Sequence, residues 1–355
     1  MHSTNDAARL PQQDVRIPVA DLQSVVESLL VKYSMFRFDA KVAAARLVEA
    51  DLHGVPSHGV VLLPRLLDAI DHGHIDPRGR VLTMTDAPCF ATLDGSRTIG
   101  PLAATQGAEL AVTKAREHGV GVVTIGNGQT LGSAEVYVRL MAKADMIGIC
   151  MSSTGGATLT APGTHAGAVG NCAIAYAVPL QNHHPLVFDS ACGAESWGKL
   201  RLLERCGLPI PPGLLFDAQQ QPTTELTPTT TMLPAGGPFG FGLSMLCSIL
   251  AGPLCNGWMP IHKTRSTDAE DSQHFFLALN PERFCDVEKF NQEIQTTLDK
   301  IRALPPLDPD HPVRIPGDRG AADHAEYLRD GIPLQSGIAQ ELKDRALVKK
   351  ITVNW

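Results

Sequence analysis

The sequence predicts an α/β fold in which an α/β domain is inserted into a mainly helical domain formed by both chain ends. Helical periodicity near the N-terminus, strands alternating with helices in the middle and helical periodicity near the C-terminus predict this arrangement. The 355 residues suffice for one large or two moderate domains, at ~100–200 residues each. A hydrophobic content of 44% and a charged content of 19% are ordinary for a globular protein with a substantial core.

The N-terminal part predicts a helical unit. Residues 1–14 are expected to be disordered, and apolar residues at helical spacing then predict three helices. The predicted helices cover about 22–31, 40–52 and 57–73. Ser57 is the expected N-cap of the third, which places His58 in its first turn.

The middle of the chain predicts strands alternating with helices. Strands are expected at 81–84, 90–93, 120–125, 146–152, 171–178 and 186–188, and helices at 103–118 and 133–144. Beyond them we expect mostly loop at 209–240, a buried helix at 240–250 and a strand at 275–279. A helix at 287–304, a loop-rich tail at 308–331 and a last helix at 336–344 are expected to follow. The predicted domains are residues 15–76 plus 241–355, which are mainly helical, and the inserted residues 77–240. Active sites favour such domain interfaces.

Charge and cysteine usage exclude several function classes. A net charge of -7 without a run of Lys or Arg argues against nucleic acid as a partner. No apolar run approaches the ~20 residues of a membrane span, and the N-terminus has no apolar signal core. The eight cysteines include no C-x-x-C pair, so we expect buried thiols in a reducing cytoplasm and no metal site.

A Ser-His pair between two glycines is the most informative local feature. His58 can donate a proton to a substrate oxygen or nitrogen at neutral pH. From residue types alone, the alternative is that Ser57 is only a helix cap and His58 only a surface residue.

Three further segments carry candidate chemistry, each with a plain alternative. The glycines at 126–132 follow a strand and precede a helix, but their G-x-G-x-x-x-G spacing departs from the Rossmann fingerprint, which leaves a tight turn whose N–H groups can bind any anion. Asp189, at a strand end, can orient His58, bind a ribose hydroxyl or cap the following segment. Four glycines at 233–243 allow close approach to a phosphate, or only close helix packing.

Together these segments resemble the type-2 malate/L-lactate dehydrogenase family, from about residue 15 to the C-terminus. The segments that carry the resemblance are ADLHGVPSHG at 50–59, GHI at 73–75, APG at 161–163, LVFD at 186–189, GK at 198–199, LPAGG at 233–237, GFGL at 240–243, IPGD at 315–318 and LRDGIPL at 328–334.

The resemblance implies a non-Rossmann α/β domain that binds NADP or NAD, a homodimer, and hydride transfer between a nicotinamide and a small-molecule 2-oxo acid or cyclic imine. It implies that His58 transfers the proton while Ser57 and Asp189 position and tune the imidazole. Thr130 stands at a further active-site position. The cofactor positions it implies are Ser153, Thr154, Pro162, Gly163, His165, Ser190, Phe239, Gly240, Pro316 and Gly317.

The sequence departs from the family pattern at ligand-facing positions. The family's substrate-binding Arg is Leu62 here, and the Tyr that follows is Leu66. The His near the nicotinamide is Thr130, and the Lys near the cofactor phosphate is Phe239. Losing a guanidinium removes the obvious carboxylate clamp, so we expect an altered substrate site. His165 is a candidate substitute for the missing His.

Three functions remain open from the sequence. The first is an NAD(P)H-dependent oxidoreductase with an altered keto or imino substrate. The second is a non-redox lyase, isomerase or tautomerase that uses Ser57, His58 and Asp189 for proton transfer. The third is an inert dimeric binding protein, against which the intact Ser-His-Gly segment argues.

Overall fold

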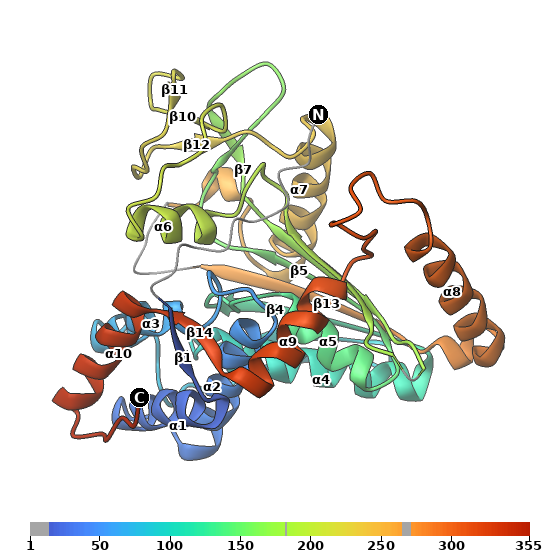
Figure 1. Ribbon diagram of the computed structural model, residues 1–355, viewed down its shortest axis with the longest axis horizontal. Coiled ribbons are helices and arrows are strands. Elements are labelled where there is room, and N and C mark those ends of the chain that lie inside the picture. The colour runs from blue at the N-terminus through green and yellow to red at the C-terminus, as the bar shows by residue number, and fades with distance from the viewer. Residues whose placement is uncertain (1–13, 182, 265–270) are drawn as a thin grey trace.

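The computed structural model describes residues 14–181, 183–264 and 271–355 (Figure 1). Of the residues 1–14 that were expected to be disordered, 1–13 lie outside the described part, and Asp14 is instead the first residue of a strand. A seven-stranded sheet crosses the molecule, with helices on both faces and a helical unit at one end (Figure 1). Its order is β2 (Leu82–Asp86), β3 (Phe90–Asp94), β4 (Val120–Gly128), β13 (Ser272–Leu279), β5 (Ile147–Ser153), β8 (Ala173–Val178) and β9 (Leu186–Ala191). Only β3 and β4 are parallel; the other neighbours are antiparallel, unlike a doubly wound Rossmann sheet.

Strand β13 corrects the expectation that residues 241–355 belong to the helical part. It pairs with β4 on one side and β5 on the other, at the centre of the sheet. Phe276 is fully buried there and Phe275 nearly so. Local pattern predicted a strand at 275–279, but a local pattern carries no information about which distant strands become its neighbours.

Helices α4 (Gly100–His118) and α5 (Glu135–Lys143) cover one face of the sheet, and helix α7 (Pro238–Leu250) covers the other. Small alanines of α4 allow it to pack closely on β4 and β13. Beyond α7, residues 209–240 form short two-residue strands where the sequence predicted mostly loop. They join a five-stranded sheet in the order β11 (Pro222–Thr223), β10 (Leu215–Phe216), β12 (Thr231–Met232), β6 (Leu159–Thr160) and β7 (Gly167–Val169).

Residues from both chain ends share the core of the helical unit. Its elements are α1 (Val19–Lys32), α2 (Arg37–Leu52), α3 (Leu63–Asp71), α10 (Ser336–Val348) and the antiparallel pair β1 (Asp14–Ile17) and β14 (Ile332–Gln335). Leu29, Leu67 and Leu342 are fully buried together in this core, which therefore ties α1, α3 and α10 into one body.

The tail at 308–331 contains a helix that the sequence prediction missed. Following α8 (Val287–Arg302), α9 (Asp318–Asp330) has no buried residue, and its sequence is rich in Asp, Arg and Gly, a composition that predicted a loop. Gly317, at φ +100°, begins the helix in a conformation that other residues rarely adopt.

Helix α7 is not the buried helix that the sequence predicted. Phe239, Leu246 and Ile249 are 71%, 45% and 46% exposed, and they give the helix an open apolar face. The run Pro238–Cys255 has a mean hydropathy of 1.6 and is 39% buried. By length and composition alone it could cross a membrane, a criterion that core helices of soluble proteins also meet.

The cysteines are all free thiols, and five of the eight are buried (Cys150, Cys172, Cys192, Cys247 and Cys255). Cys89 and Cys206 are half-buried, and Cys285 is exposed. Within the described ranges, no group of three or more His, Cys, Asp or Glu is placed to hold a metal ion.

Candidate active site

One end of the large sheet gathers most of the predicted site. The register pairs Gly128 with Ser272, Ser153 with Gln273, Ser152 with Ala173, and Ala173 with Ala191. The segments that continue from β4, β5 and β9 therefore leave the sheet at the same end. They carry Thr130, Thr154 and the stretch after Ser190.

The Ser57–His58 loop approaches this edge from the helical unit, and its local structure differs from the prediction. Ser57 is not an N-cap: its Oγ lies 2.8 Å from Nδ1 of His58. Helix α3 begins only at Leu63, after a 3-10 turn at Val60–Leu62. Gly59, at φ −97° and ψ −136°, interrupts any helix that starts at Ser57.

A buried carboxyl group fixes this loop. Oδ2 of Asp51, at the end of α2, accepts the N–H of Val60 at 2.7 Å, and Asp51 is only 3% exposed. A Cβ on Gly59 would lie 2.2 Å from that carboxylate, so the close approach requires glycine. Burial raises the pKa of Asp51 to about 8, since its charged form is poorly solvated.

His58 is half-buried and tightly surrounded. A Cβ on Gly198, in α6 (Trp197–Arg205), would lie 2.8 Å from Cε1 and 3.0 Å from Nε2 of the ring. Burial lowers the pKa of His58 to about 4, and the positive charge of Arg65 adds to the effect. The imidazole is therefore neutral at neutral pH and can accept a proton.

Asp189 holds the turn between β4 and α5. Its Oδ2 accepts the Ser133 hydroxyl at 3.1 Å and the N–H of Glu135 at 2.9 Å. The carboxylate thus lies at the N-terminus of α5. The sequence analysis expected N–H groups there that could bind any anion, and Asp189 takes that place. The sequence also allowed Asp189 to cap the segment that follows it, and this interpretation is wrong. The cap of the next helix, α6, is Ser196, whose hydroxyl oxygen accepts the N–H of Lys199 at 3.1 Å. Burial is the main cause that raises the pKa of Asp189.

His58 and Asp189 are joined through the turn, not by a contact between their side chains. Across the described residues, the hydrogen bonds of His58 and Asp189 run to different partners. The turn itself touches both: a Cβ on Gly132 would lie 3.0 Å from the His58 carbonyl oxygen, and Ser133 binds Asp189. Asp189 therefore positions the segment that packs against His58.

The sequence reading missed the charged group behind Asp189. Glu135 and Arg139 of α5 are buried, with 3.7 Å between Oε2 and Nη2. Burial raises the pKa of Glu135 to about 7, although Arg139 opposes the shift. The i, i+4 spacing of these two charges on an apolar helix was the signal that could have found them. Gly198 belongs to a segment that carries the resemblance, but its contact with His58, like that of Ser133 with Asp189, joins distant parts of the chain and has no local signal.

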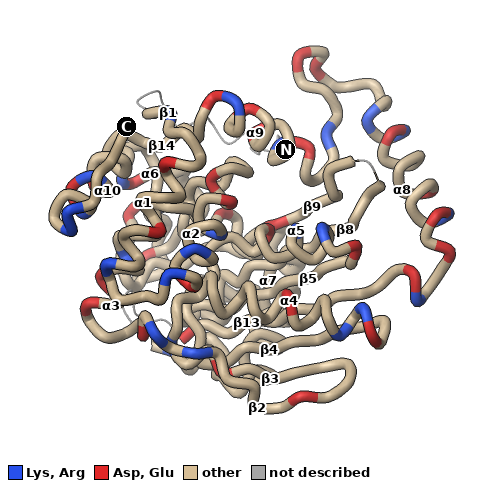
Figure 2. Tube along the Cα trace, turned by 90° about the horizontal axis from the view of Figure 1, so that it is seen from below, with Lys and Arg blue, Asp and Glu red and all other residues tan. Residues whose placement is uncertain are grey.

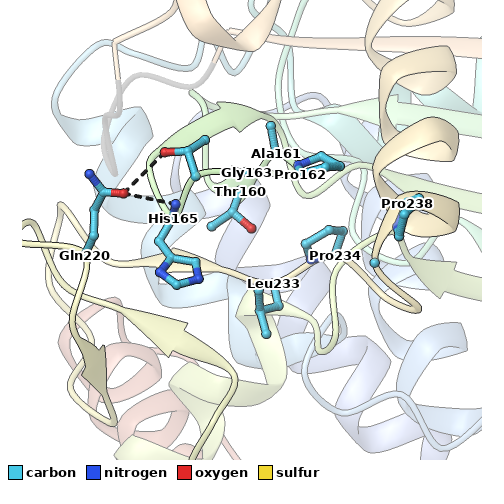
Figure 3. Close-up of a pocket in the computed structure, with 11 residues that line it drawn as sticks. Thr160, Ala161, Pro162, Gly163, His165, Gln220, Leu233, Pro234 and Pro238 are labelled. Atoms are coloured by element: carbon cyan, nitrogen blue, oxygen red, sulfur yellow. Dashed lines mark hydrogen bonds between the residues drawn. The ribbon is translucent and has the colours of Figure 1, made fainter.

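A cavity of about 330 Å³ lies between the loop after β6 and the start of α7 (Figure 3). It brings together the predicted cofactor residues Pro162, Gly163 and His165 with Gly237 and Pro238. The cavity lining includes no Lys or Arg. His165 stacks on Phe216 with 3.6 Å between ring centroids, and its backbone N–H donates to Gln220 at 3.0 Å.

The remaining predicted residues occupy four places. Ser153 and Thr154 follow β5; Ser153 is fully buried, and Thr154 accepts the hydroxyl of Ser272 at 3.2 Å. Ser190 donates to the Ala191 carbonyl at 3.0 Å.

Around α7, Phe239 is exposed, whereas Gly240 is packed so closely that a Cβ would meet the Ala235 oxygen at 2.4 Å. Near β9, the Pro316 oxygen accepts the N–H of Val187 at 3.2 Å, which places Gly317 close to that strand. Thr130 is half-buried, with its carbonyl group against Gly100.

Comparison with known proteins supports the resemblance along nearly the whole chain. The family model described as malate/L-lactate dehydrogenase matches residues 17–343. A malate dehydrogenase of Pyrococcus horikoshii is 31% identical over 344 residues, 94% of this chain and 95% of the relative. Hydroxycarboxylate dehydrogenase B of Escherichia coli is 28% identical over 342 residues, 93% of each chain. A solved structure, a putative malate/lactate dehydrogenase from E. coli, superposes with a TM-score of 0.88 at 27% identity, covering 95% of this chain and 96% of that one. The chain therefore belongs to the malate/L-lactate dehydrogenase family of oxidoreductases.

Proposed function

We propose that this protein is an NAD- or NADP-dependent oxidoreductase that interconverts a 2-oxo acid or cyclic imine with its reduced form, with an altered substrate site. The observation that carries the proposal is the His58 imidazole, held by Ser57 at Nδ1 and packed on Gly198 where α3, α6 and the β4–α5 turn meet. A neutral imidazole of this kind is a general base for an alcohol or amine and, once protonated, a general acid for the reverse reaction.

The cavity beside α7 suits part of a nicotinamide dinucleotide. A Cβ atom placed on Gly163 or on Gly237 would have no neighbouring atom within 4 Å. The backbone on these two sides of the cavity is therefore open to a ligand. The N-terminus of α7 borders the cavity, and helix N-termini favour phosphate. We therefore assign the non-Rossmann α/β part to nucleotide binding, with Pro162, Gly163 and His165 as contacts and exposed Phe239 as a stacking surface.

The chain's own residues carry the proton chemistry. When bound, the nicotinamide supplies or accepts a hydride at the substrate carbon. With the Nδ1 proton donated to Ser57 Oγ, Nε2 of His58 presents a lone pair that takes the proton of a substrate hydroxyl or amine. Ser57 thus orients the ring, and Asp189 fixes the turn against which the ring loop packs. Thr130, on the same turn, cannot replace the proton-transfer role of a His.

The altered substrate site follows from Leu62. Its Cδ1 lies 4.0 Å from the Cβ position of Gly132, so an isobutyl group faces the turn beside His58. A substrate carboxylate gains no guanidinium partner from this position, which favours a substrate whose charge is absent or placed elsewhere.

We also propose that the protein is a cytoplasmic homodimer, with the second copy covering the apolar face of α7. Leu246 and Ile249 lie on that face, and Leu254 and Trp258 extend it at 50% and 66% exposure. Monomers rarely expose apolar patches of this kind. The eight free cysteines suit a reducing compartment.

A non-redox enzyme that uses Ser57, His58 and Asp189 for proton transfer is the second candidate. The observation in its favour is the lack of Lys or Arg in the lining of the cavity beside α7, which weakens phosphate binding there. This second candidate requires Asp189 to act on His58. The structure meets that requirement poorly, because the two side chains have different hydrogen-bond partners.

Calorimetric titration of the full chain with NADH and NADPH separates the two candidates. We expect at least one nucleotide to bind with a micromolar to sub-millimolar Kd, and His58→Gln to bind it equally well because the ring does not line the cavity. Absence of binding by both nucleotides at millimolar concentration, together with turnover in their absence, would overturn the redox proposal in favour of the second candidate.

A further inference from the structure

Buried side chains hold the turn that packs against His58. In this β4–α5 turn, residues 129–134, buried and half-buried residues alternate from 129 to 133. The three buried residues of that run are each bound by a side chain from outside the turn, namely His274 on Gln129, Tyr137 on Leu131 and Asp189 on Ser133. Thr130 and Gly132 lie between these fixed points, and Gly132 meets the carbonyl oxygen of His58.

His274 reaches this turn from the centre of the sheet. It lies in β13, which runs beside β4 in Figure 2, and neither strand contains Lys, Arg, Asp or Glu. The side chain is fully buried. Its Nε2 lies 2.9 Å from the Gln129 carbonyl oxygen, and its Nδ1 lies 2.9 Å from Oγ of Ser152. Because a carbonyl oxygen can only accept, Nε2 carries the proton and donates it to Gln129, while Nδ1 accepts the Ser152 hydroxyl.

The surroundings of His274 rule out direct proton exchange with a substrate. Burial lowers the pKa of His274 to about 4, although the bond to Gln129 opposes the shift. The ring is therefore neutral at neutral pH, and its single N–H is used on Gln129. Both nitrogens have partners within the protein, and the side chain has no exposed surface. What this ring can do is hold the turn.

The contact lies where β4 leaves the sheet. The ladder between β4 and β13 changes register between Ser272 and His274, and its last pair joins Ser272 to Gly128. Such bulges bend a strand and redirect the chain. Gln129 follows directly, and its carbonyl oxygen lies between His274 and α4, where a Cβ on Gly100 would meet it at 2.5 Å. The start of the turn is therefore fixed from two sides.

We propose that His274 is a positioning residue for the reaction at His58: its N–H bond to Gln129 sets the place of Thr130 and Gly132 against the His58 loop. This inference rests on the proposed function, because it treats the turn as part of the site in which His58 transfers a proton. A small displacement of a reacting group reduces the rate strongly. Nucleotide binding should be unaffected, since the lining of the cavity beside α7 includes no residue of the turn.

Glutamine and asparagine at this position separate the roles of the two ring nitrogens. The amide of glutamine reaches the place of Nε2 and can donate to Gln129, whereas the shorter asparagine reaches only the place of Nδ1. We expect His274→Asn to lose about 10–100-fold in kcat, and His274→Gln to stay within about threefold of the wild type. KM and the calorimetric Kd for the nucleotide should change little in both variants. Rates are compared on the compound that the wild type turns over fastest.

Hydrogen exchange of the peptide that spans residues 129–134 tests the same contact without any substrate. Exchange should be faster in His274→Asn than in the wild type and in His274→Gln. The matched control is Asn280→Ala, just beyond the opposite end of β13, which removes a buried side-chain oxygen that accepts the N–H of Glu282 at 3.1 Å. This control should lower the melting temperature but leave kcat and the exchange of the turn at wild-type values.

Three results would overturn the positioning role. They are wild-type kcat or wild-type exchange in His274→Asn, equal losses of kcat in the asparagine and glutamine variants, and an equal loss in Asn280→Ala. A wild type that binds neither nucleotide and turns over no 2-oxo acid or cyclic imine would instead contradict the proposed function. The exchange experiment alone then decides whether His274 holds the turn.

Discussion

At the scale of single residues, the proposed chemistry depends on a neutral imidazole. Ser57 binds Nδ1 of His58, while burial and the charge of Arg65 keep the pKa of the ring at about 4. Residue types and the family resemblance named both residues from the sequence. They could not give the pKa, because the burial that lowers it involves distant segments of the chain, such as Gly198 packed beside the ring.

The low pKa predicts opposite pH dependence for the two reaction directions. Oxidation requires the neutral ring, so its kcat/KM should stay nearly constant above about pH 5 and fall below the pKa of His58, about 4. Reduction requires the protonated ring and should lose about tenfold per pH unit above that value. Initial rates in both directions from pH 4 to 9 check this. A reduction rate that is constant to pH 7 would contradict the assigned role.

Replacing Leu62 by Arg tests the altered substrate site. A guanidinium beside the Gly132 turn offers a bidentate partner for a 2-oxo acid carboxylate. We expect KM for short 2-oxo acids to fall about 10-fold or more, from a charged hydrogen-bond pair of ~1.5–3 kcal/mol. KM for a neutral ketone should not fall. Equal changes for charged and neutral substrates would contradict the interpretation.

Asp51 predicts a pH-dependent stability. The folded protein keeps this carboxyl protonated up to about pH 8, whereas the unfolded chain releases the proton near 3.8. Its contribution is thus fully present below pH 3.8 and is lost as pH rises to about 8, by up to ~1.4 kcal/mol per pH unit. Asp51→Asn cannot ionise, so its free energy of unfolding should decline less between pH 5 and 8. Urea unfolding of both proteins measures this, and parallel pH curves would refute it.

At the scale of elements, the contact between α6 and the His58 loop sets the ring position. Gly198→Ala would place a methyl group 2.8 Å from Cε1 of the ring, so the imidazole must move. We expect kcat/KM to fall about 10–100-fold, since small displacements of a reacting group are costly. Nucleotide affinity and the melting temperature should change little.

Gly337→Ala is the matched control for this substitution. Gly337 lies in α10, where a Cβ would meet its nearest atom at 3.8 Å, an ordinary contact. It should retain full activity. Equal losses in the two variants would show that the effect is not specific to the ring contact.

Elements that bury an apolar face were predictable, whereas an element without buried residues was not. Helix α1 and strand β4 carry strong local patterns and were found within a few residues. Helix α9 has no buried residue, and its sequence, rich in Asp, Arg and Gly, was interpreted as loop. The central place of β13 depends on pairing with strands more than 100 residues away, which no local pattern records.

At the scale of the whole molecule, the apolar face of α7 predicts the assembly. Leu246→Asp combined with Ile249→Asp puts charges on that face and should convert a dimer to the 37.9 kDa monomer in sedimentation experiments. Leu347→Asp, at a residue that is 75% exposed on α10, is the control and should remain dimeric. A wild-type monomer at micromolar concentration would refute the proposed dimer.

The most direct measurement compares the wild type with His58→Gln in oxidation of reduced nicotinamide, followed by absorbance with a panel of 2-oxo acids and cyclic imines. The wild type should turn over at least one compound of the panel. His58→Gln should lose about 10²–10⁴-fold in kcat while it still binds the nucleotide, as expected when a positioned acid–base group is removed. Undiminished turnover by His58→Gln would contradict the assignment of the proton-transfer group.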